Sequence, residues 1–374
     1  MLSREKFSFF MPVHIHFGID SIQKVSKVIS CFNPEKILLV TGKISARKYG
    51  NLKRLTDTLY RQEFFIFDEI DINPTLDVME KGVEFSKNNG IELVIGLGGG
   101  SALDAGKCIA MMTKQEFSIK TYLKEKMHLE QGIPFIAIPT TSGTGSDVTP
   151  WASIWDHQVK RKFSIEDTFL FPAVSIIDPT LTLSKPGSLT AVTGLDALCH
   201  AVEAYWSKRS NPVSDSFAEL AIQLIVKDLA NAVKSPDVLE YRVNMAKGSL
   251  YAGIAFSQTK TTACHAFSYP LTVHFEIPHG LACAMTLPSI FKLNAPVIGK
   301  KAQKLTEWFG ADSIQATPQK IRDIMKPLNV PTRLNKGNID IDSVFNVDSL
   351  TDRIMNNPKE IKKEHVTQII ENIL

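Results

Sequence analysis

Short runs of apolar and β-branched residues alternate with helical patterns along the first half of the chain, and this alternation restricts the fold more than any other feature. Strands are expected at 36–42, 63–70, 91–100 and 134–141, and a first strand is expected around His14 and His16. Strands that are apolar along nearly their whole length, with helices between them, are typical of a parallel sheet covered on both faces. The first half is therefore predicted to be an α/β domain.

The pattern changes near residue 185, where a segment containing proline, glycine and serine is typical of a hinge. From there to about residue 330 the apolar spacing is helical, for example around 214–233, and no convincing strand alternation is found. A chain of 374 residues also exceeds the size at which single cores stop growing. We predict an α/β domain over residues 1–187 and an all-α domain over residues 188–374.

Composition excludes several classes of protein. The net charge is only +3 and no basic tail or stripe is present, so a nucleic-acid partner is not expected. The five cysteines are scattered without a C-x-x-C pair, which favours a reducing compartment over a disulfide scaffold. The N-terminal apolar run is too interrupted for a signal peptide, and no stretch approaches the roughly 20 apolar residues of a membrane span. We expect a cytoplasmic protein without a membrane partner.

A glycine-rich loop follows the third expected strand and opens a helix, in the sequence VIGLGGGSALDAGK at 94–107. Gly98, Gly99 and Gly100 lack side chains, so a phosphate can approach the backbone amides, and Ser101 with the first helical turn offers further donors. A tight strand-to-helix turn is the alternative explanation. A second cluster of small and hydroxyl residues, IPTTSGTGSDVT at 138–149, favours a nucleotide site at the carboxyl ends of the strands.

Asp196 and His200 are four residues apart in an apolar helical pattern, so both project from one helix face. A buried hydrogen-bonded pair and a metal site both explain such a pair. His265 and His279 lie fourteen residues apart, with Pro270 and Pro278 between them, so the segment can fold back on itself. One carboxylate and three imidazoles together suit Fe²⁺ or Zn²⁺ with a position left open for substrate.

These features together resemble the iron-containing (group III) alcohol dehydrogenase family, which is related in fold to dehydroquinate synthase. The resemblance rests on GGGSALDAGK at 98–107, PTTSGTGSDVT at 139–149, DALCHAVEAY at 196–205 and HAFSYPLTVHFEIPHG at 265–280. It implies that Asp196, His200, His265 and His279 are the metal ligands. It also implies a dinucleotide in a cleft between the domains, and a homodimer.

The resemblance places the pyrophosphate on Gly98 to Ser101 and puts further cofactor-binding residues at Asn73, Asp104, Thr140, Thr141 and Thr144. Many family members carry an aspartate after the strand that ends here in LLVTGK, and this carboxylate repels a 2′-phosphate. The position is Gly42 in this chain, with Lys43 and Arg47 close by. We therefore expect NADPH to be used at least as well as NADH.

Typical members also carry a histidine four residues after the third ligand, and Tyr269 takes that position here. A phenol can donate a proton to a developing alkoxide but is a poor base at neutral pH, which favours aldehyde reduction. Proton delivery through water or the cofactor ribose is the alternative to Tyr269.

Two segments, 149–165 and 259–272, are similar to the phosphonoacetaldehyde reductase branch, whose substrate is a small aldehyde carrying a dianion. Lys260 is the expected cation for that anion, ahead of the basic run at 160–162. The chain is thus expected to be a metal-dependent NAD(P)H reductase that converts phosphonoacetaldehyde to 2-hydroxyethylphosphonate. The alternatives are a general short-chain alcohol or lactaldehyde dehydrogenase and a lyase like dehydroquinate synthase.

Overall fold

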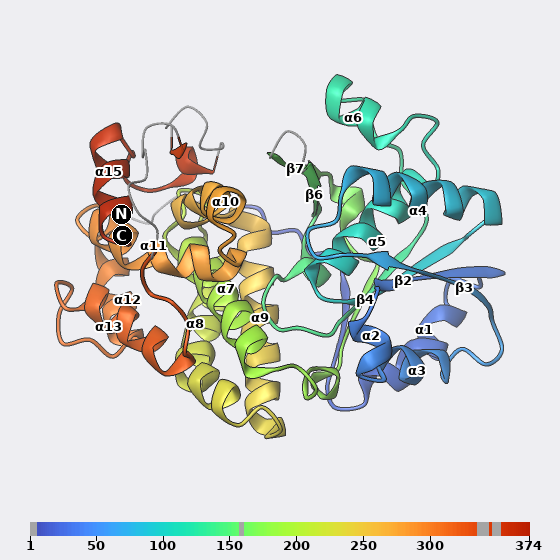
Figure 1. The fold of residues 1–374 in the computed structure, drawn as a ribbon, viewed down its shortest axis with the longest axis horizontal. Helices are drawn as coiled ribbons and strands as arrows, with labels where there is room; N and C mark the ends of the chain where they lie inside the picture. The colour runs from blue at the N-terminus through green and yellow to red at the C-terminus, as the bar shows by residue number, and fades with distance from the viewer. Residues whose placement is uncertain (1–5, 157–160, 335–343, 346–352) are drawn as a thin grey trace. The chain divides into compact units, whose positions relative to one another are not determined.

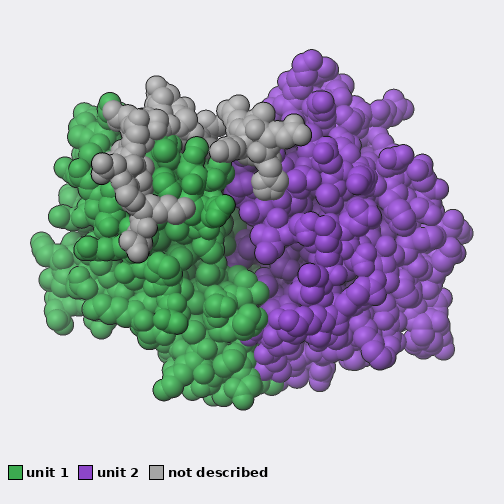
Figure 2. Space-filling view, in the orientation of Figure 1, with its two compact units in different colours: residues 1–11, 186–374 green, residues 12–185 purple. Residues whose placement is uncertain are grey.

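The computed structural model describes residues 6–156, 161–334, 344–345 and 353–374, and the chain forms two compact units (Figure 2). One unit is Pro12–Lys185, and the other joins Met1–Met11 to Pro186–Leu374. The start of the chain, expected in the α/β domain, thus belongs with the helices. Phe10 holds it there, because its backbone N–H donates to Gln258 Oε1 at 3.0 Å and its carbonyl accepts from Gln258 Nε2 at 2.8 Å.

The α/β unit contains a six-stranded sheet in the order β1-β8-β5-β4-β2-β3, and every neighbouring pair of strands is parallel (Figure 1). This confirms the predicted parallel sheet. Strand β8 was not predicted. The strands are β1 (His14–Phe17), β2 (Lys36–Gly42), β3 (Glu63–Ile70), β4 (Leu93–Gly98), β5 (Phe135–Pro139) and β8 (Val174–Ile177).

Both faces of the sheet are buried, because alternate side chains of each strand point to opposite sides. In β2, Leu38 and Val40 join a core cluster with helices α4 (Leu76–Asn89) and α5 (Gly100–Met112). Ile37 and Leu39 of the same strand join a second cluster, which contains residues of α1 (Val25–Ser30), α2 (Ser45–Lys48) and α3 (Asn51–Thr56). The near-continuous apolar strands of the sequence follow from this two-sided burial.

The α/β unit also contains helix α6 (Ile119–Glu125) and an antiparallel hairpin of β6 (Trp151–Asp156) and β7 (Arg161–Glu166), which was not predicted. Helix α5 anchors the hairpin through two side chains. Asp104 Oδ2 accepts from the Ser153 backbone N–H at 2.9 Å, and the buried Lys107 ammonium donates to the carbonyls of Thr149, at 3.2 Å, and Trp151.

The second unit is helical, and its described residues contain no strand, as predicted. Helix α8 begins cleanly because Asn211 and Ser214 form a capping box and Pro212 occupies the first turn. Along the described residues, no helix combines the length and apolarity needed to cross a bilayer. The helices are α7 (Gly187–Trp206), α8 (Pro212–Lys234), α9 (Leu239–Thr259), α10 (Ala263–Phe275), α11 (His279–Asn294), α12 (Lys300–Trp308), α13 (Thr317–Met325) and α15 (Lys363–Glu371).

Candidate functional site

Helix α7 carries three polar side chains on one face in otherwise apolar surroundings. Asp196, His200 and Glu203 are spaced by four and three residues, so they lie above one another on consecutive turns. All three are buried, and Glu203 is completely inaccessible to solvent. Buried charges are costly unless they are paired or bind a metal, so this face requires partners from other helices.

Helices α10 and α11 supply those partners. His265 lies in the first turn of α10, and His279 is the first residue of α11. Gly280 allows α11 to approach α7 closely, because a Cβ atom at this position would lie 2.7 Å from Asp196 Cβ and would overlap the Val192 carbonyl. The absence of a side chain at Gly280 therefore brings His279 to Asp196.

The donor atoms of these residues are spaced as ligands of one ion would be. His265 Nε2 lies 3.5 Å and His279 Nε2 lies 3.9 Å from Asp196 Oδ1. Two donors that each lie about 2.1 Å from a tetrahedral ion are about 3.4 Å apart. Asp196 Oδ1 and His265 Nε2 are buried and have no hydrogen-bond partner in the described part of the chain. The residues therefore fit a divalent metal ion.

Asp196, His265 and His279 form a compact donor group with a fourth residue, Cys283, which was not predicted. The ligand atoms of Asp196, His265, His279 and Cys283 all lie within 4.8 Å of one another, and Cys283 is one helical turn after His279. His200 lies beside this group, with its ring stacked on that of His265 at a centroid distance of 4.4 Å. Three of the four predicted ligands thus lie in one compact donor group with a thiol, and the fourth, His200, contacts that group through its ring.

Two hydrogen bonds orient the histidine rings. Glu203 Oε2 accepts from His265 Nδ1, which leaves Nε2 facing Asp196. Ser268 Oγ donates to the His265 carbonyl at 2.8 Å, and since a hydroxyl has a single hydrogen, it accepts from His279 Nδ1 at 3.1 Å. Partners of this kind fix the tautomer of metal-binding histidines. Glu203 and Ser268 were not predicted, although Glu203 falls on the same helix face as Asp196.

The charge states of the carboxylates follow from their surroundings. Burial alone would raise the pKa of Asp196, but His200, His265 and His279 hold that pKa well below its usual range. Burial opposes ionisation of Glu203 in the same way, yet His265 keeps the pKa of Glu203 below its ordinary value. Both groups are therefore carboxylates at neutral pH, as metal binding and the orientation of His265 require.

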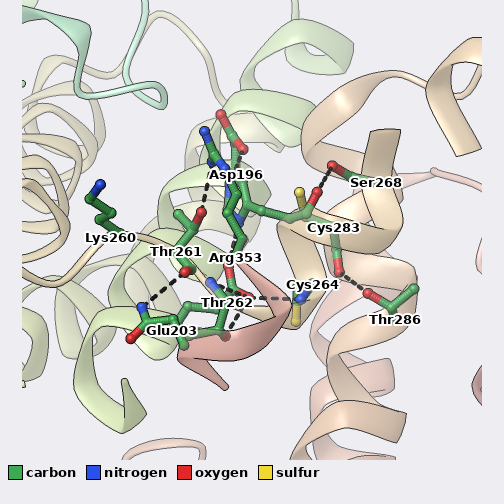
Figure 3. Close-up of polar contacts among 12 residues, drawn as sticks. Asp196, Glu203, Lys260, Thr261, Thr262, Cys264, Ser268, Cys283, Thr286 and Arg353 are labelled. Carbon is green, nitrogen blue, oxygen red and sulfur yellow. Dashed lines mark hydrogen bonds and ion pairs between the residues drawn. The ribbon is translucent and has the colours of Figure 1, made fainter. Parts of the chain in front are cut away.

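The two predicted catalytic residues lie on or next to helix α10. The Tyr269 ring stacks on the His279 ring in parallel, with an interplanar angle of 5° and a centroid distance of 5.8 Å. Tyr269 is half-buried, and this stack puts its ring beside a candidate metal ligand. Lys260 directly follows the last residue of helix α9. It lies two residues before Thr262, whose backbone N–H and hydroxyl both donate to Glu203 (Figure 3).

In the α/β unit, the glycine loop forms a cradle without side chains at the start of α5. A Cβ atom at Gly98 would lie 2.7 Å from Ala102 Cβ, and one at Gly100 would lie 2.7 Å from Thr144 Cγ2. A side chain at Gly98 or Gly100 would therefore displace a neighbouring residue, and the N-terminus of α5 that follows suits an anion. Strands β2 and β4 flank the point where the strand order reverses, which is where open α/β sheets bind ligands.

Other predicted cofactor residues gather around this cradle. The Asn73 backbone N–H donates to Ser101 Oγ at 3.3 Å, and the Thr140 backbone N–H donates to the Gly98 carbonyl at 2.8 Å. Thr141 Oγ1 would lie 3.3 Å from a Cβ atom at Gly99. These residues come from three separate segments that meet at the carboxyl ends of the strands.

Asp104 has a different environment. Its carboxylate accepts from the Ser146 hydroxyl at 2.5 Å and from the Ser153 backbone N–H, so it holds the loop and the hairpin. Gly42 ends β2, and the two cations that follow it each have a carboxylate partner: Lys43 contacts Asp71, and Arg47 Nη2 lies 2.7 Å from Asp68 Oδ2.

Models of one protein family match both the α/β unit and the helical unit. Residues 12–179 match the model of iron-containing alcohol dehydrogenases, and residues 190–374 match the C-terminal model of the same family. The chain is 35% identical to 1,3-propanediol dehydrogenase of Citrobacter freundii over 83% of this chain and 81% of that protein.

Solved structures share the whole fold. Sulfoacetaldehyde reductase from Bifidobacterium kashiwanohense, solved with NAD⁺, superposes with a TM-score of 0.93 at 32% identity over 99% of each chain. An iron-containing alcohol dehydrogenase from Thermotoga maritima gives a TM-score of 0.89 at 32% identity over 98% of this chain and 99% of that one. With its donor cluster on α7, α10 and α11 and its glycine cradle after β4, the chain belongs to the iron-containing alcohol dehydrogenase family.

Proposed function

We propose that this chain is a metal-dependent NAD(P)H aldehyde reductase whose best substrate is phosphonoacetaldehyde, reduced to 2-hydroxyethylphosphonate. The single observation that carries the proposal is the cluster of Asp196, His265 and His279 donor atoms beside Tyr269, in a chain of the iron-containing alcohol dehydrogenase family. Such a cluster would hold a divalent ion that supplies Lewis-acid chemistry, and the adjacent phenol carries a proton that it can donate.

The reaction takes an aldehyde, NAD(P)H and a proton to an alcohol and NAD(P)⁺. When bound, Fe²⁺ or Zn²⁺ supplies Lewis-acid polarisation of the carbonyl, and NAD(P)H supplies the hydride. Glu203 and Ser268 hold the imidazoles of His265 and His279 in the tautomers that ligation needs. The Tyr269 ring stacks on that of His279, and this proximity supports the proposal that the Tyr269 phenol donates a proton to the developing alkoxide.

The cofactor assignment rests on the cradle of Gly98, Gly99 and Gly100 and on one relative. The glycines and the start of α5 suit a pyrophosphate, and sulfoacetaldehyde reductase was solved with NAD⁺. That relative also favours a small anionic substrate, because sulfoacetaldehyde is a two-carbon aldehyde that carries a sulfonate. Phosphonoacetaldehyde has the same skeleton with a phosphonate.

The proposal is tested with anaerobic, Fe²⁺-loaded protein by following the absorbance of NADPH or NADH while aldehydes are titrated. We expect kcat/KM for phosphonoacetaldehyde to exceed that for propanal by about a hundredfold, or about 2.7 kcal/mol of discrimination. Equal values for the two aldehydes would remove the phosphonate from the proposal. Absence of net NAD(P)H turnover would instead favour a lyase like dehydroquinate synthase.

A second candidate is the reduction of sulfoacetaldehyde, favoured by the structural likeness to the reductase of that name. A third is a dehydrogenase for short uncharged alcohols, favoured by the identity to 1,3-propanediol dehydrogenase. The same titration separates them when sulfoacetaldehyde and 3-hydroxypropanal are included, since each candidate predicts a different leading kcat/KM.

A further inference from the structure

The loop between α9 and α10 contains a backbone conformation that residues with side chains rarely adopt. Lys260 has φ 59° and ψ 174°, in a region that is essentially restricted to glycine. Such conformations persist only where the surrounding structure holds them, and they cluster at functional sites. A lysine therefore occupies a position where glycine would adopt the same backbone conformation without strain.

Hydrogen bonds hold this loop from two sides. Asn356 Nδ2 donates to the carbonyls of Thr259, at 2.8 Å, and Thr261, at 3.1 Å, which flank Lys260. On the other side, the Thr262 backbone N–H and hydroxyl donate to Glu203 Oε1 at 3.1 and 2.7 Å. The strained loop is thus fastened both to the 353–357 segment and to the carboxylate that orients His265.

The same C-terminal segment brings a guanidinium to the site. Arg353 Nη1 donates to Thr261 Oγ1 at 2.8 Å (Figure 3). The guanidinium also lies over the Tyr269 ring, 5.3 Å from its centroid. Tyr269 in turn stacks on His279. One aromatic ring therefore separates Arg353 from a candidate metal ligand.

The guanidinium retains capacity for an anion. Of its five N–H donors, one is given to Thr261, and Arg353 forms no ion pair with a carboxylate of the described residues. The contact with the Tyr269 ring and the hydrogen bond to Thr261 hold the guanidinium in position, and a guanidinium suits bidentate binding of a phosphonate or sulfonate. Lys260 is a second cation on the loop that Arg353 contacts.

We propose that Arg353 determines substrate specificity by binding the terminal oxyanion of a small aldehyde, with Lys260 as the supporting cation. This inference rests on the proposed function, because it names the group that recognises the anionic end of that substrate. It assigns recognition to a residue that lies 88 positions after His265 in the sequence. Arg353 stands outside every motif that identifies the family here.

The test compares wild type with Arg353→Ala and Arg353→Lys, using phosphonoacetaldehyde and propanal as substrates. For Arg353→Ala we expect kcat/KM for phosphonoacetaldehyde to fall about 10- to 100-fold, mainly through KM, as loss of a charged hydrogen bond requires. The value for propanal should change less than about threefold. Arg353→Lys should recover part of the loss, because lysine keeps the positive charge but lacks the paired N–H donors of the guanidinium. Lys304→Ala, an exposed cation paired with Glu307, is the control and should behave as wild type.

A second readout does not depend on turnover. Ethylphosphonate carries the anion without an aldehyde, and its dissociation constant for the metal-free protein is measured by calorimetry. Weakening of about tenfold or more in Arg353→Ala supports the assignment. Unchanged ethylphosphonate affinity, or equal losses for both aldehydes, overturns it. If wild type itself does not prefer phosphonoacetaldehyde, the proposed function fails, whereas a wild-type preference that survives in Arg353→Ala rejects only the role of Arg353.

Discussion

The carboxylate of Glu203 accepts a hydrogen bond from Nδ1 of His265 inside the helical unit, where both side chains are buried. Glu203 also accepts from the backbone N–H groups of Thr262 and Cys264, so its charge is satisfied without solvent. The pair fixes the one ring nitrogen of His265 that faces Asp196. Glu203 is therefore a positioning residue for the candidate metal centre.

Glu203→Gln should lower the affinity of the protein for a divalent metal about 10- to 100-fold, because an amide no longer requires the Nδ1-protonated tautomer of His265. The dissociation constant is measured by competition with a chromophoric chelator. Asp228→Asn serves as the control, since Asp228 is also a buried carboxylate of this unit but binds Asn231 and Asn244. A similar loss of affinity in both variants would show that Glu203 acts only through general stability.

Gly280→Ala should separate α11 from α7, because the new Cβ would collide with the Val192 carbonyl and with Asp196 Cβ. We expect a loss of about 1–3 kcal/mol in the free energy of unfolding, together with weaker metal binding. Gly248→Ala is the comparison, since its Cβ would meet the Ile225 side chain, 2.7 Å away, rather than backbone. Denaturant unfolding with and without metal measures both effects, and unchanged metal affinity in Gly280→Ala would contradict the prediction.

Lys260→Gly should stabilise the protein relative to Lys260→Ala by about 1 kcal/mol, because only glycine relaxes at this φ and ψ. Both variants remove the ammonium, so both should raise KM for phosphonoacetaldehyde far more than for propanal. Thermal unfolding of the two variants gives the stability difference. Equal effects on both aldehydes would reject a substrate role for Lys260.

NADPH should support turnover at least as well as NADH, although Lys43 and Arg47 each have a carboxylate partner. The Lys43–Asp71 pair is exposed, and exposed ion pairs contribute only about 0–1 kcal/mol, so a 2′-phosphate can compete for the cation. Asp71→Asn should therefore increase the ratio of kcat/KM for NADPH to that for NADH, and Lys43→Ala should decrease it. A wild-type preference for NADH above about tenfold would contradict this expectation.

Cys283 should contribute a sulfur ligand to a bound ion, because its Sγ lies in the compact donor group. Protein loaded with Co²⁺ should then show a thiolate-to-cobalt absorption band in the near ultraviolet, and Cys283→Ala should abolish it. Cys264→Ala, which removes another buried thiol of the same unit, should retain the band. Absence of the band from wild type would place Cys283 outside the coordination sphere.

The sequence predicts the framework of this molecule well because periodicity directly reports burial. Strands β2 and β3 and the change to helices near residue 185 follow from apolar patterns within one segment. The hairpin of β6 and β7 was missed because its stability depends on contacts with Asp104 and Lys107 rather than on its own pattern.

The candidate site likewise contains residues that the sequence indicates and residues that only the structure reveals. The predicted ligands are marked by residue type and by the family resemblance. The roles of Glu203, Ser268 and Cys283 become visible only when α7, α10 and α11 are brought together, since each of these residues meets a side chain from another helix. Arg353 is the extreme case, because nothing near it in the sequence indicates that it lies over Tyr269.

Because residues before Pro12 belong with the helical unit, the polypeptide passes from one unit to the other twice, once after Met11 and once after Lys185. A single proteolytic cut between residues 185 and 186 would therefore leave residues 1–11 covalently attached to the α/β unit although they belong with the helical one. A protein made of residues 186–374 alone would also lack Phe10, whose backbone forms two hydrogen bonds with the Gln258 side chain. No single cut of the chain therefore yields both units intact.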